Sequence, residues 1–232
     1  MKVAVLSDIH ANLPALDAVL RESARLKVSR FIFAGDFLGY YFNGGEVLDR
    51  IRHLNAHCVR GNHDQFYIKN YMQNSGVSSE IVHHPGKRSF DLLKLSLENK
   101  KFLSGLPHPL FLELHGRKIL LAHGHPSEIN LYVYPNDIEE KHFLNYSVDL
   151  IILGHTHWQT YNRFKEFGVL NPGSVGQPRD GIPGAAWALL DLSDLSVEFY
   201  RTQYDNQKLL SDCKEFDPDN YALTKQFFRD HV

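Results

Sequence analysis

The chain has 232 residues, 43% of them hydrophobic and 22% charged, which is ordinary for a globular protein with a substantial core. Its formal net charge of -2 gives no electrostatic reason to expect a nucleic acid or an anionic membrane as partner. The two cysteines, Cys58 and Cys213, lie far apart without a CxxC partner, which excludes a disulfide framework and a thiolate metal site. Neither a signal-like apolar segment nor a run long enough to span a membrane is present, so we expect a cytoplasmic protein.

Five short apolar runs organise the chain, and each ends in side chains that can bind a metal. The runs cover residues 2–7, 30–34, 56–59, 118–122 and 149–153. In the same order they lead into Asp8 and His10, Asp36, Asn62-His63-Asp64, His123, and His155 with His157. Buried strands of an α/β sheet read as continuous apolar runs, and ligands bind outside their carboxyl ends. The five polar ends are therefore expected to converge.

The first third of the chain predicts a βαβαβ unit. Asn12 as N-cap and Pro14 in the first turn predict a helix over about 12–27, and a second amphipathic helix is expected over about 46–54. A polar, helix-compatible stretch, about 65–106, then reads as a helical insertion beside the polar ends, with its clearest helix over 89–102. Its position after His63 motivates the hypothesis of a lid.

The second half predicts a further sheet. Residues 110–114 and 118–122 form an expected hairpin, and 137–146 is an expected helix. The runs 160–164, 168–170, 185–190 and 197–202 predict short strands of a second sheet, mixed or antiparallel. A polar tail over about 205–232 contains helix-compatible segments at 208–214 and 221–228. No repeat or linker divides the chain, which favours one domain over residues 1–232.

The candidate ligands form a mixed oxygen and imidazole set without sulfur. They are Asp8, His10, Asp36, Asn62, His123, His155 and His157. Seven ligands exceed what one first-row ion uses, whereas two ions about 3.5–4 Å apart, bridged by the two oxygens of Asp36, would use them all. Water between two such ions loses a proton near pH ~7, and the resulting hydroxide is a nucleophile suited to attack phosphorus.

These blocks resemble the calcineurin-like metallophosphoesterases. The family's D-x-H, GD, GNH(D/E), H and GH-x-H signature is matched in order from Asp8 to His157. The opening segment 7–13 and the segment 171–175 are similar to those of its small bacterial and archaeal phosphodiesterase-like branch. The resemblance implies a four-layer αββα sandwich, an α/β fold with two mixed β-sheets.

The resemblance also implies roles for the site residues. Asp8, His10 and His157 would hold one metal, Asn62, His123 and His155 the other, and Asp36 would bridge them. His63 corresponds to the family's general acid or leaving-group stabiliser, and Asp64 to the carboxylate that orients it. Two divalent ions are thus the expected cofactors, with Mn²⁺ as first choice and Fe, Zn or Ni as alternatives.

Two departures bear on the substrate. The second acid of the GD-x-x-D block is missing, because Gly39 follows Phe37 and Leu38 after Gly35-Asp36, and the arginine that follows GD in protein phosphatases has no counterpart. Phosphoprotein specificity is therefore not implied. Arg60 and Arg179 are the candidates for binding substrate phosphate, because guanidinium pairs with phosphate through two hydrogen bonds. His125 is interpreted as an accessory histidine, and Tyr40, Tyr132 and Tyr134 as packing residues in preference to base-stacking ones.

The expected function is hydrolysis of small phosphodiesters or nucleotides by a hydroxide that bridges the two metals. The enzymatic alternatives are a phosphomonoesterase, a protein phosphatase-like enzyme or a dinucleoside-polyphosphate hydrolase. A catalytically silent scaffold of the same fold, like the retromer-type proteins, is the alternative outside enzymes. The expected partner is a small phosphoester or nucleotide, with no membrane and no strong nucleic-acid signal, and a homo-oligomer is left open.

Overall fold

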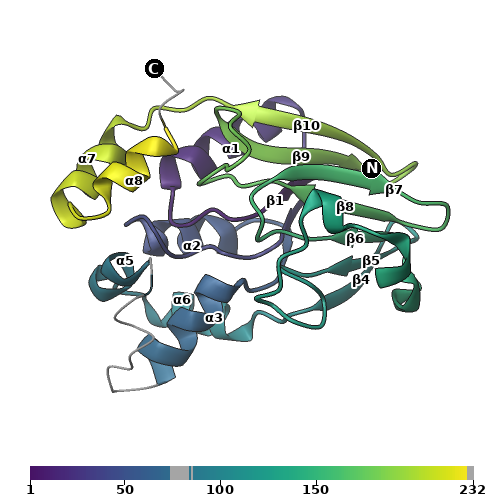
Figure 1. Cartoon of the computed structure of the whole chain (residues 1–232), viewed down its shortest axis with the longest axis horizontal. Coiled ribbons are helices and arrows are strands. Elements are labelled where there is room, and N and C mark those ends of the chain that lie inside the picture. The colour runs from purple at the N-terminus through teal and green to yellow at the C-terminus, as the bar shows by residue number, and fades with distance from the viewer. Residues whose placement is uncertain (74–83, 85, 229–232) are drawn as a thin grey trace.

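The computed structural model describes residues 1–73, 84 and 86–228 (Figure 1). The strands are β1 (Lys2–Leu6), β2 (Phe31–Phe33), β3 (Ala56–Cys58), β4 (Leu110–Leu114), β5 (Arg117–Leu121), β6 (Leu150–Ile152), β7 (Gln159–Arg163), β8 (Gly168–Pro172), β9 (Ala185–Asp191) and β10 (Ser196–Thr202). The α-helices are α1 (Leu13–Arg25), α2 (Gly44–Arg52), α3 (Asn62–Tyr67), α5 (Lys87–Leu92), α6 (Leu97–Gly105), α7 (Gln207–Phe216) and α8 (Tyr221–Gln226). A π-helical turn, η1 (Ile68–Gln73), continues α3.

The strands form two mixed five-stranded sheets. The first has the order β10-β9-β1-β2-β3, with β1, β2 and β3 parallel and β9 antiparallel to β1. The second has the order β4-β5-β6-β8-β7, with β5, β6 and β8 parallel and the two edge strands antiparallel. The predicted fold class is confirmed. The predicted sheet membership was wrong for β9 and β10, because β9 pairs with β1 and extends the first sheet.

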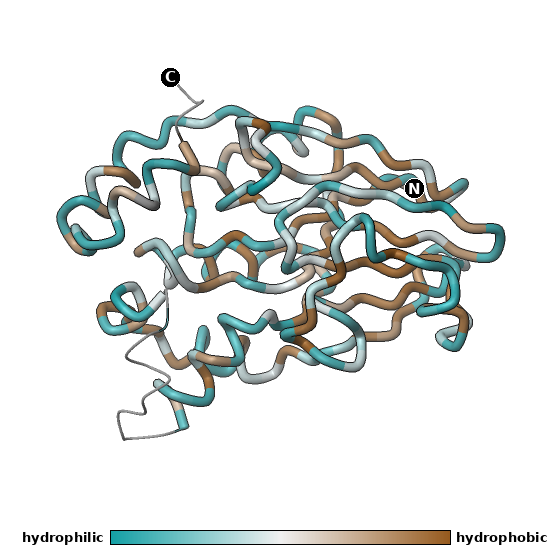
Figure 2. Tube along the Cα trace, viewed as in Figure 1, coloured by the Kyte–Doolittle hydropathy of each residue, from teal (hydrophilic) through white to brown (hydrophobic). Residues whose placement is uncertain are grey.

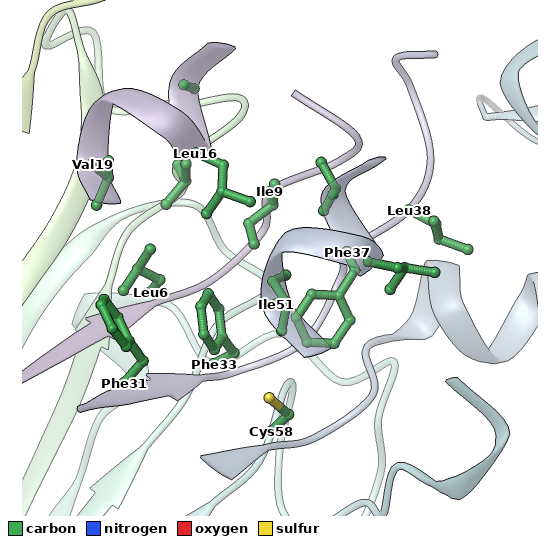
Figure 3. Close-up of a cluster of buried hydrophobic side chains, with 14 of the residues drawn as sticks. Leu6, Ile9, Leu16, Val19, Phe31, Phe33, Phe37, Leu38, Ile51 and Cys58 are labelled. Carbon is green, nitrogen blue, oxygen red and sulfur yellow. The ribbon is translucent and has the colours of Figure 1, made fainter. Parts of the chain in front are cut away.

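Successive side chains of β1 point to opposite faces of the first sheet and so belong to two different hydrophobic cores. Val3 and Val5 belong to a cluster between the sheets, together with residues of β5, β6 and β8. Ala4 and Leu6 face the other way and pack with side chains of α1 and α2. Figure 3 shows Leu16 of α1 above Leu6 and the phenylalanines of β2. Each residue of β1 after Lys2 is therefore buried, on one face by a sheet and on the other by helices.

The outer face of the second sheet is covered by irregular structure. Three 3₁₀ turns, Pro135–Asp137, Glu140–His142 and Leu144–Tyr146, replace the helix predicted over 137–146. That prediction was wrong because the side chains that enter this core, Val133, Ile138 and Phe143, recur every five residues. Such a spacing does not keep them on one face of a 3.6-residue helix.

The helix predicted over 89–102 is divided into α5 and α6. The backbone becomes extended at Leu93. Leu95, which lies between α5 and α6 in sequence, joins the core that contains Ala4, Leu6 and side chains of α1 and α2. Ser96 then caps α6, because its hydroxyl oxygen accepts the backbone N–H of Asn99 at 3.1 Å. Ser96 is a residue type that favours helix N-caps, so the sequence contains this signal for the start of a second helix. Residues 74–83 and 85 of the predicted insertion, and 229–232 of the predicted tail, lie outside the described residues.

The helix that follows the first polar cluster begins as predicted. The side-chain oxygen of Asn12 accepts the backbone N–H of Ala15 at 3.2 Å, and Pro14 lies in the first turn of α1. Figure 2 shows hydrophobic residues concentrated along the central strands and hydrophilic ones along α7, α8 and the loops. Among the described helices, none combines the length and the apolar character that a membrane span requires.

Candidate metal centre

The polar ends of β1, β2, β3, β5 and β6 meet where the carboxyl ends of the two sheets come together. Backbone bonds tie the loops directly, since Asp8 N–H donates to Gly35 O and Gly154 N–H donates to His123 O. The N–H of His155 reaches across from the second sheet to Asp8 Oδ2 at 3.0 Å. Strands from two sheets, and not from one, therefore build the predicted site.

The predicted ligand atoms form overlapping groups whose members lie within 4.8 Å of one another. One group contains Asp8, His10 and His157, and another contains Asp36, His123 and His155. Asp36 lies between them, because its Oδ2 is 3.3 Å from His123 Nε2 and 3.8 Å from His10 Nε2.

Asn62 completes the second of these groups. Its Oδ1 lies 2.9 Å from His123 Nε2. All seven residues that the sequence nominates thus come together, and a third group, made by His10, Asp36 and His63, overlaps the other two.

Backbone carbonyls fix which ring nitrogen of each histidine faces the centre. The Nδ1 atoms of His10, His123 and His157 lie 3.1, 2.7 and 2.6 Å from carbonyl oxygens. A carbonyl oxygen only accepts, so each Nδ1 donates its hydrogen, and the lone pair of a neutral ring is left on Nε2. In His155 the two ring nitrogens exchange these roles, because Nε2 donates to Asn130 O at 3.2 Å and Nδ1 keeps the lone pair. In each neutral ring, the nitrogen that does not contact a carbonyl oxygen is therefore left with its lone pair free for a metal ion.

Ring nitrogens and a carboxylate oxygen face one another at the middle of the arrangement. Nε2 of His10 and Nε2 of His157 lie 3.1 Å apart, although both are lone-pair acceptors in this tautomer. Asp8 Oδ1 is fully buried and has no hydrogen-bond donor among the described residues. Facing acceptors and an orphaned carboxylate oxygen are costly unless a cation lies among them. The residues present therefore fit divalent metal ions.

The carboxyl groups of the centre stay ionised. Burial alone would raise the pKa of Asp8, but the neighbouring charges of His157 and His123 bring this pKa well below its usual value. Burial likewise opposes ionisation of Asp36, and His123 again lowers the pKa. In return, Asp36 and Asp8 overcome the effect of burial on His123 and raise its pKa to about 9, so a metal ion that binds Nε2 would take the place of a proton on this ring. Two anionic carboxylates in a buried site attract a cation, which agrees with the geometric fit.

Five of the residues adopt left-handed backbone conformations. Asp8, His10, Asp36, His155 and His157 have φ between 52° and 69°. This region costs a non-glycine residue about 1–3 kcal/mol, and such strain clusters at functional sites. The sharp turns let each strand end aim a side chain at the centre instead of continuing the strand.

Comparison with known proteins agrees with this geometry. The model of the calcineurin-like phosphoesterase superfamily domain matches residues 1–195, most of the chain. The chain belongs to this superfamily.

Several calcineurin-like relatives cover almost the whole chain. A protein of Methanocaldococcus jannaschii, MJ0912, is 34% identical over 226 residues, covering 89% of each chain. Phosphodiesterase YfcE of Escherichia coli is 27% identical over 208 residues, covering 85% of this chain and 91% of its own. A metallophosphoesterase from Sphaerobacter thermophilus superposes with a TM-score of 0.78 at 27% identity, covering 93% of each chain.

In this calcineurin-like chain, His63 lies beside the metal centre. Its ring contacts those of His10, Tyr40 and His84, with centroids 4.9, 4.9 and 4.8 Å away. Burial lowers the pKa of His63 to about 3, so that its ring is neutral at pH 7. Its Nδ1 is buried and has no hydrogen-bond partner within the described ranges.

Asp64 makes different contacts from those that the resemblance implied. Its carboxylate accepts backbone N–H groups from Gly61, Phe37 and Leu38 at 2.9, 3.1 and 3.1 Å. Among the described residues, no hydrogen bond joins it to the ring of His63. Asp64 therefore links the loop after β2 to the loop after β3.

Gly61 is required where these two loops meet. A Cβ atom at this position would lie 2.0 Å from Asp36 Oδ1 and 2.4 Å from Asp36 N. Only glycine lets the carboxylate of Asp36 approach the backbone so closely, and the N–H of His63 then donates to that oxygen at 2.9 Å.

The two candidate arginines differ in their surroundings. Arg179 donates to the hydroxyl of Tyr40 at 3.2 Å, and the Tyr40 ring lies 4.7 Å from that of His10. Arg60 donates its backbone N–H to Pro107 O, and in the described part of the chain no hydrogen bond or ion pair joins its side chain to the candidate ligands. Tyr40, interpreted as a packing residue, thus connects Arg179 to the centre, a link that no sequence signal reveals.

Proposed function

We propose that this protein is a dinuclear-metal phosphoesterase that hydrolyses small phosphodiesters or nucleotides. The observation that carries the proposal is the convergence of seven inward-facing ligands around an orphaned carboxylate oxygen of Asp8. Asp8, His10 and His157 would hold one ion, Asn62, His123 and His155 the other, and Asp36 would bridge them. When bound, two such ions activate water and neutralise phosphate charge. Mn²⁺ is the first metal to test, and Fe, Zn and Ni are the alternatives.

His63 is proposed to stabilise the leaving oxygen by hydrogen bonding. Because burial lowers the pKa of His63 to about 3, the neutral ring with one N–H is the form available at pH 7. A neutral ring favours donation of a hydrogen bond over complete proton transfer. Of the two roles that the resemblance offers, leaving-group stabiliser therefore agrees better with the burial.

Arg179 is proposed to face the non-reacting part of the substrate's phosphate. The contact of its guanidinium with Tyr40 supports this role, since Tyr40 touches both His10 and His63. Arg60 is the weaker candidate, because among the described residues no hydrogen bond joins its side chain to a candidate ligand or to a neighbour of one. Asp64 is proposed to position Asp36 and His63 by holding their loops together.

A phosphodiester is favoured over a monoester as substrate. Support comes from the named activity of the relative YfcE, a phosphodiesterase, and from the missing second acid of the GD block, which sets the chain apart from protein phosphatases.

The test is the initial rate on a chromogenic diester and its matching monoester after metal is stripped and Mn²⁺ restored. We expect metal-dependent cleavage, faster on the diester, that Asp36→Asn abolishes. His63→Ala should reduce kcat while bound metal, measured by elemental analysis, is unchanged. Bound metal without turnover on any phosphoester, or no bound metal, would instead support the silent scaffold.

A further inference from the structure

A cavity of about 420 Å³ opens beside the metal centre and is not used by the proposed chemistry. Its apolar wall is made by Leu131, Tyr132, Val133 and Phe143. This volume lies within the range of small-molecule sites, which are mostly apolar with a few polar groups. Val133 and Phe143 are anchored in the core under the second sheet, so the wall is preformed.

Tyr132 connects this cavity to the centre. Its ring lines the cavity and also stacks on the ligand-candidate His155, with centroids 3.8 Å apart and an interplanar angle of 21°. Tyr132 as a residue remains 42% exposed, and its side chain lines the cavity, so it is accessible to a bound molecule. Tyr134 stacks on Tyr132 at 5.4 Å and supports the wall from outside the cavity lining. A substrate with its phosphate at the metals thus has an aromatic-walled space next to it.

Three polar side chains complete the cavity, and none of them is a lysine or arginine. They are His125, Asp137 and His142. A cavity with a carboxylate and no fixed cation disfavours a phosphate or another anion. It favours an uncharged group that can donate a hydrogen bond to Asp137.

His125 supplies the complementary donor. Its Nδ1 accepts the backbone N–H of Ser127 at 3.3 Å and lies 2.8 Å from the Ser127 hydroxyl. Because a backbone N–H only donates, the neutral ring of His125 carries its hydrogen on Nε2. This N–H has no hydrogen-bond acceptor among the described residues. The cavity therefore offers the donor of His125 and the acceptor of Asp137 beside an aromatic wall, and His142 can act as either donor or acceptor.

We infer that this cavity binds the base of a nucleoside phosphodiester, and that it prefers a base with an amino group next to a ring-nitrogen acceptor, as in adenine. The inference rests on the proposed function, since the phosphate of the same substrate would lie at the metal centre. Adenine presents a ring nitrogen as acceptor and its N6 amino group as donor, which matches His125 and Asp137. Its flat ring suits the wall formed by Tyr132 and Phe143.

The first experiment measures binding without catalysis. Adenosine and inosine are titrated into the metal-free protein and followed by ligand-observed NMR. Inosine has a carbonyl oxygen in place of the amino group and a hydrogen on the adjacent ring nitrogen. Adenosine should bind more tightly, and Tyr132→Ala should weaken it roughly 5- to 150-fold, the loss typical of removing a base-stacking aromatic. Asp137→Asn, an isosteric change at an exposed residue, should remove the preference for adenosine. Equal binding of both nucleosides, or no binding of either, would overturn the inference.

The second experiment separates this inference from the proposed function. The Mn²⁺-loaded enzyme is assayed on methyl p-nitrophenyl phosphate, which has no base, and on the p-nitrophenyl esters of adenosine and inosine 5′-monophosphate. We expect the adenosine ester to have the lowest KM, and Tyr132→Ala to raise it more than the KM of the methyl ester. Phe199→Ala is the control: it removes the aromatic ring of a β10 residue that is also 42% exposed, and it should change neither the KM of the adenosine ester nor that of the methyl ester. Cleavage of all three esters with equal KM would refute the base site alone, whereas no cleavage of any would refute the proposed function.

Discussion

Removing the carboxylate of Asp64 should destabilise the protein even without metal. In Asp64→Ala, the N–H groups of Gly61, Phe37 and Leu38 lose their acceptor in a position from which water is excluded, since Asp64 is fully buried. Each unpaired buried donor costs about 1–3 kcal/mol, which gives roughly 3–9 kcal/mol in total. The free energy of unfolding of a domain is about 5–15 kcal/mol, so the variant should be marginal or unfolded.

Asp64→Asn provides the intermediate case. It keeps one acceptor oxygen but turns an amide N–H₂ group toward backbone donors. Its free energy of unfolding should therefore decrease by roughly half as much as that of Asp64→Ala. Asp17→Ala is the matched control, because this carboxylate pairs with the side chain of Arg50 at the surface. Exposed ion pairs contribute about 0–1 kcal/mol to the free energy of unfolding, so Asp17→Ala should change it little.

Urea unfolding of the metal-free proteins, followed by circular dichroism, measures these differences. The expected order of stability is wild type and Asp17→Ala together, then Asp64→Asn, then Asp64→Ala. A free energy of unfolding for Asp64→Ala within about 1 kcal/mol of that for Asp17→Ala would refute the role of Asp64 as the link between the two loops.

Three further predictions concern the loops, the pH response and the metals. Gly61→Ala should abolish Mn²⁺ binding in equilibrium dialysis because its Cβ would displace Asp36, whereas Gly105→Ala, with no atom within 4 Å, should bind normally. Burial lowers the pKa of His108 to about 4, below the unfolded value near 6.5, so its contribution to stability is lost as pH falls from about 6.5 through 4. As pH falls over that window, the urea midpoints of metal-free His108→Gln should therefore fall less steeply than those of the metal-free wild type. An identical slope would contradict the lowered pKa of His108. Mn²⁺ at 100 times its dissociation constant should stabilise the wild type by about 2.7 kcal/mol in thermal unfolding, and Asp36→Asn should show no such shift.

Sequence reasoning located much of the candidate site because the informative residues lie directly after recognisable strands. An apolar run followed by Asp8 and His10, or by His155 and His157, is local information. Strand ends and their polar residues are encoded together within a few positions, which is why all seven nominated ligands meet in the structure.

Local periodicity was less reliable where burial followed another spacing. Val133, Ile138 and Phe143 enter a core every five residues, so apolar content suggested a helix where the chain forms 3₁₀ turns. The predicted helix over 89–102 broke at Leu93, and Ser96 started a second helix. In both segments, contacts with distant strands or caps outweighed helix propensity.

The sequence by itself determined which residues could ligate metal and where most strands begin and end, because both depend on neighbours along the chain. Only the tertiary structure decided that β9 pairs with β1, that Asp64 binds amides of a loop 27 residues away, and that Arg179 reaches Tyr40. It also placed Tyr132 between His155 and a cavity. These are contacts between segments far apart in sequence, and they depend on how two sheets stack, which no local pattern of residues records.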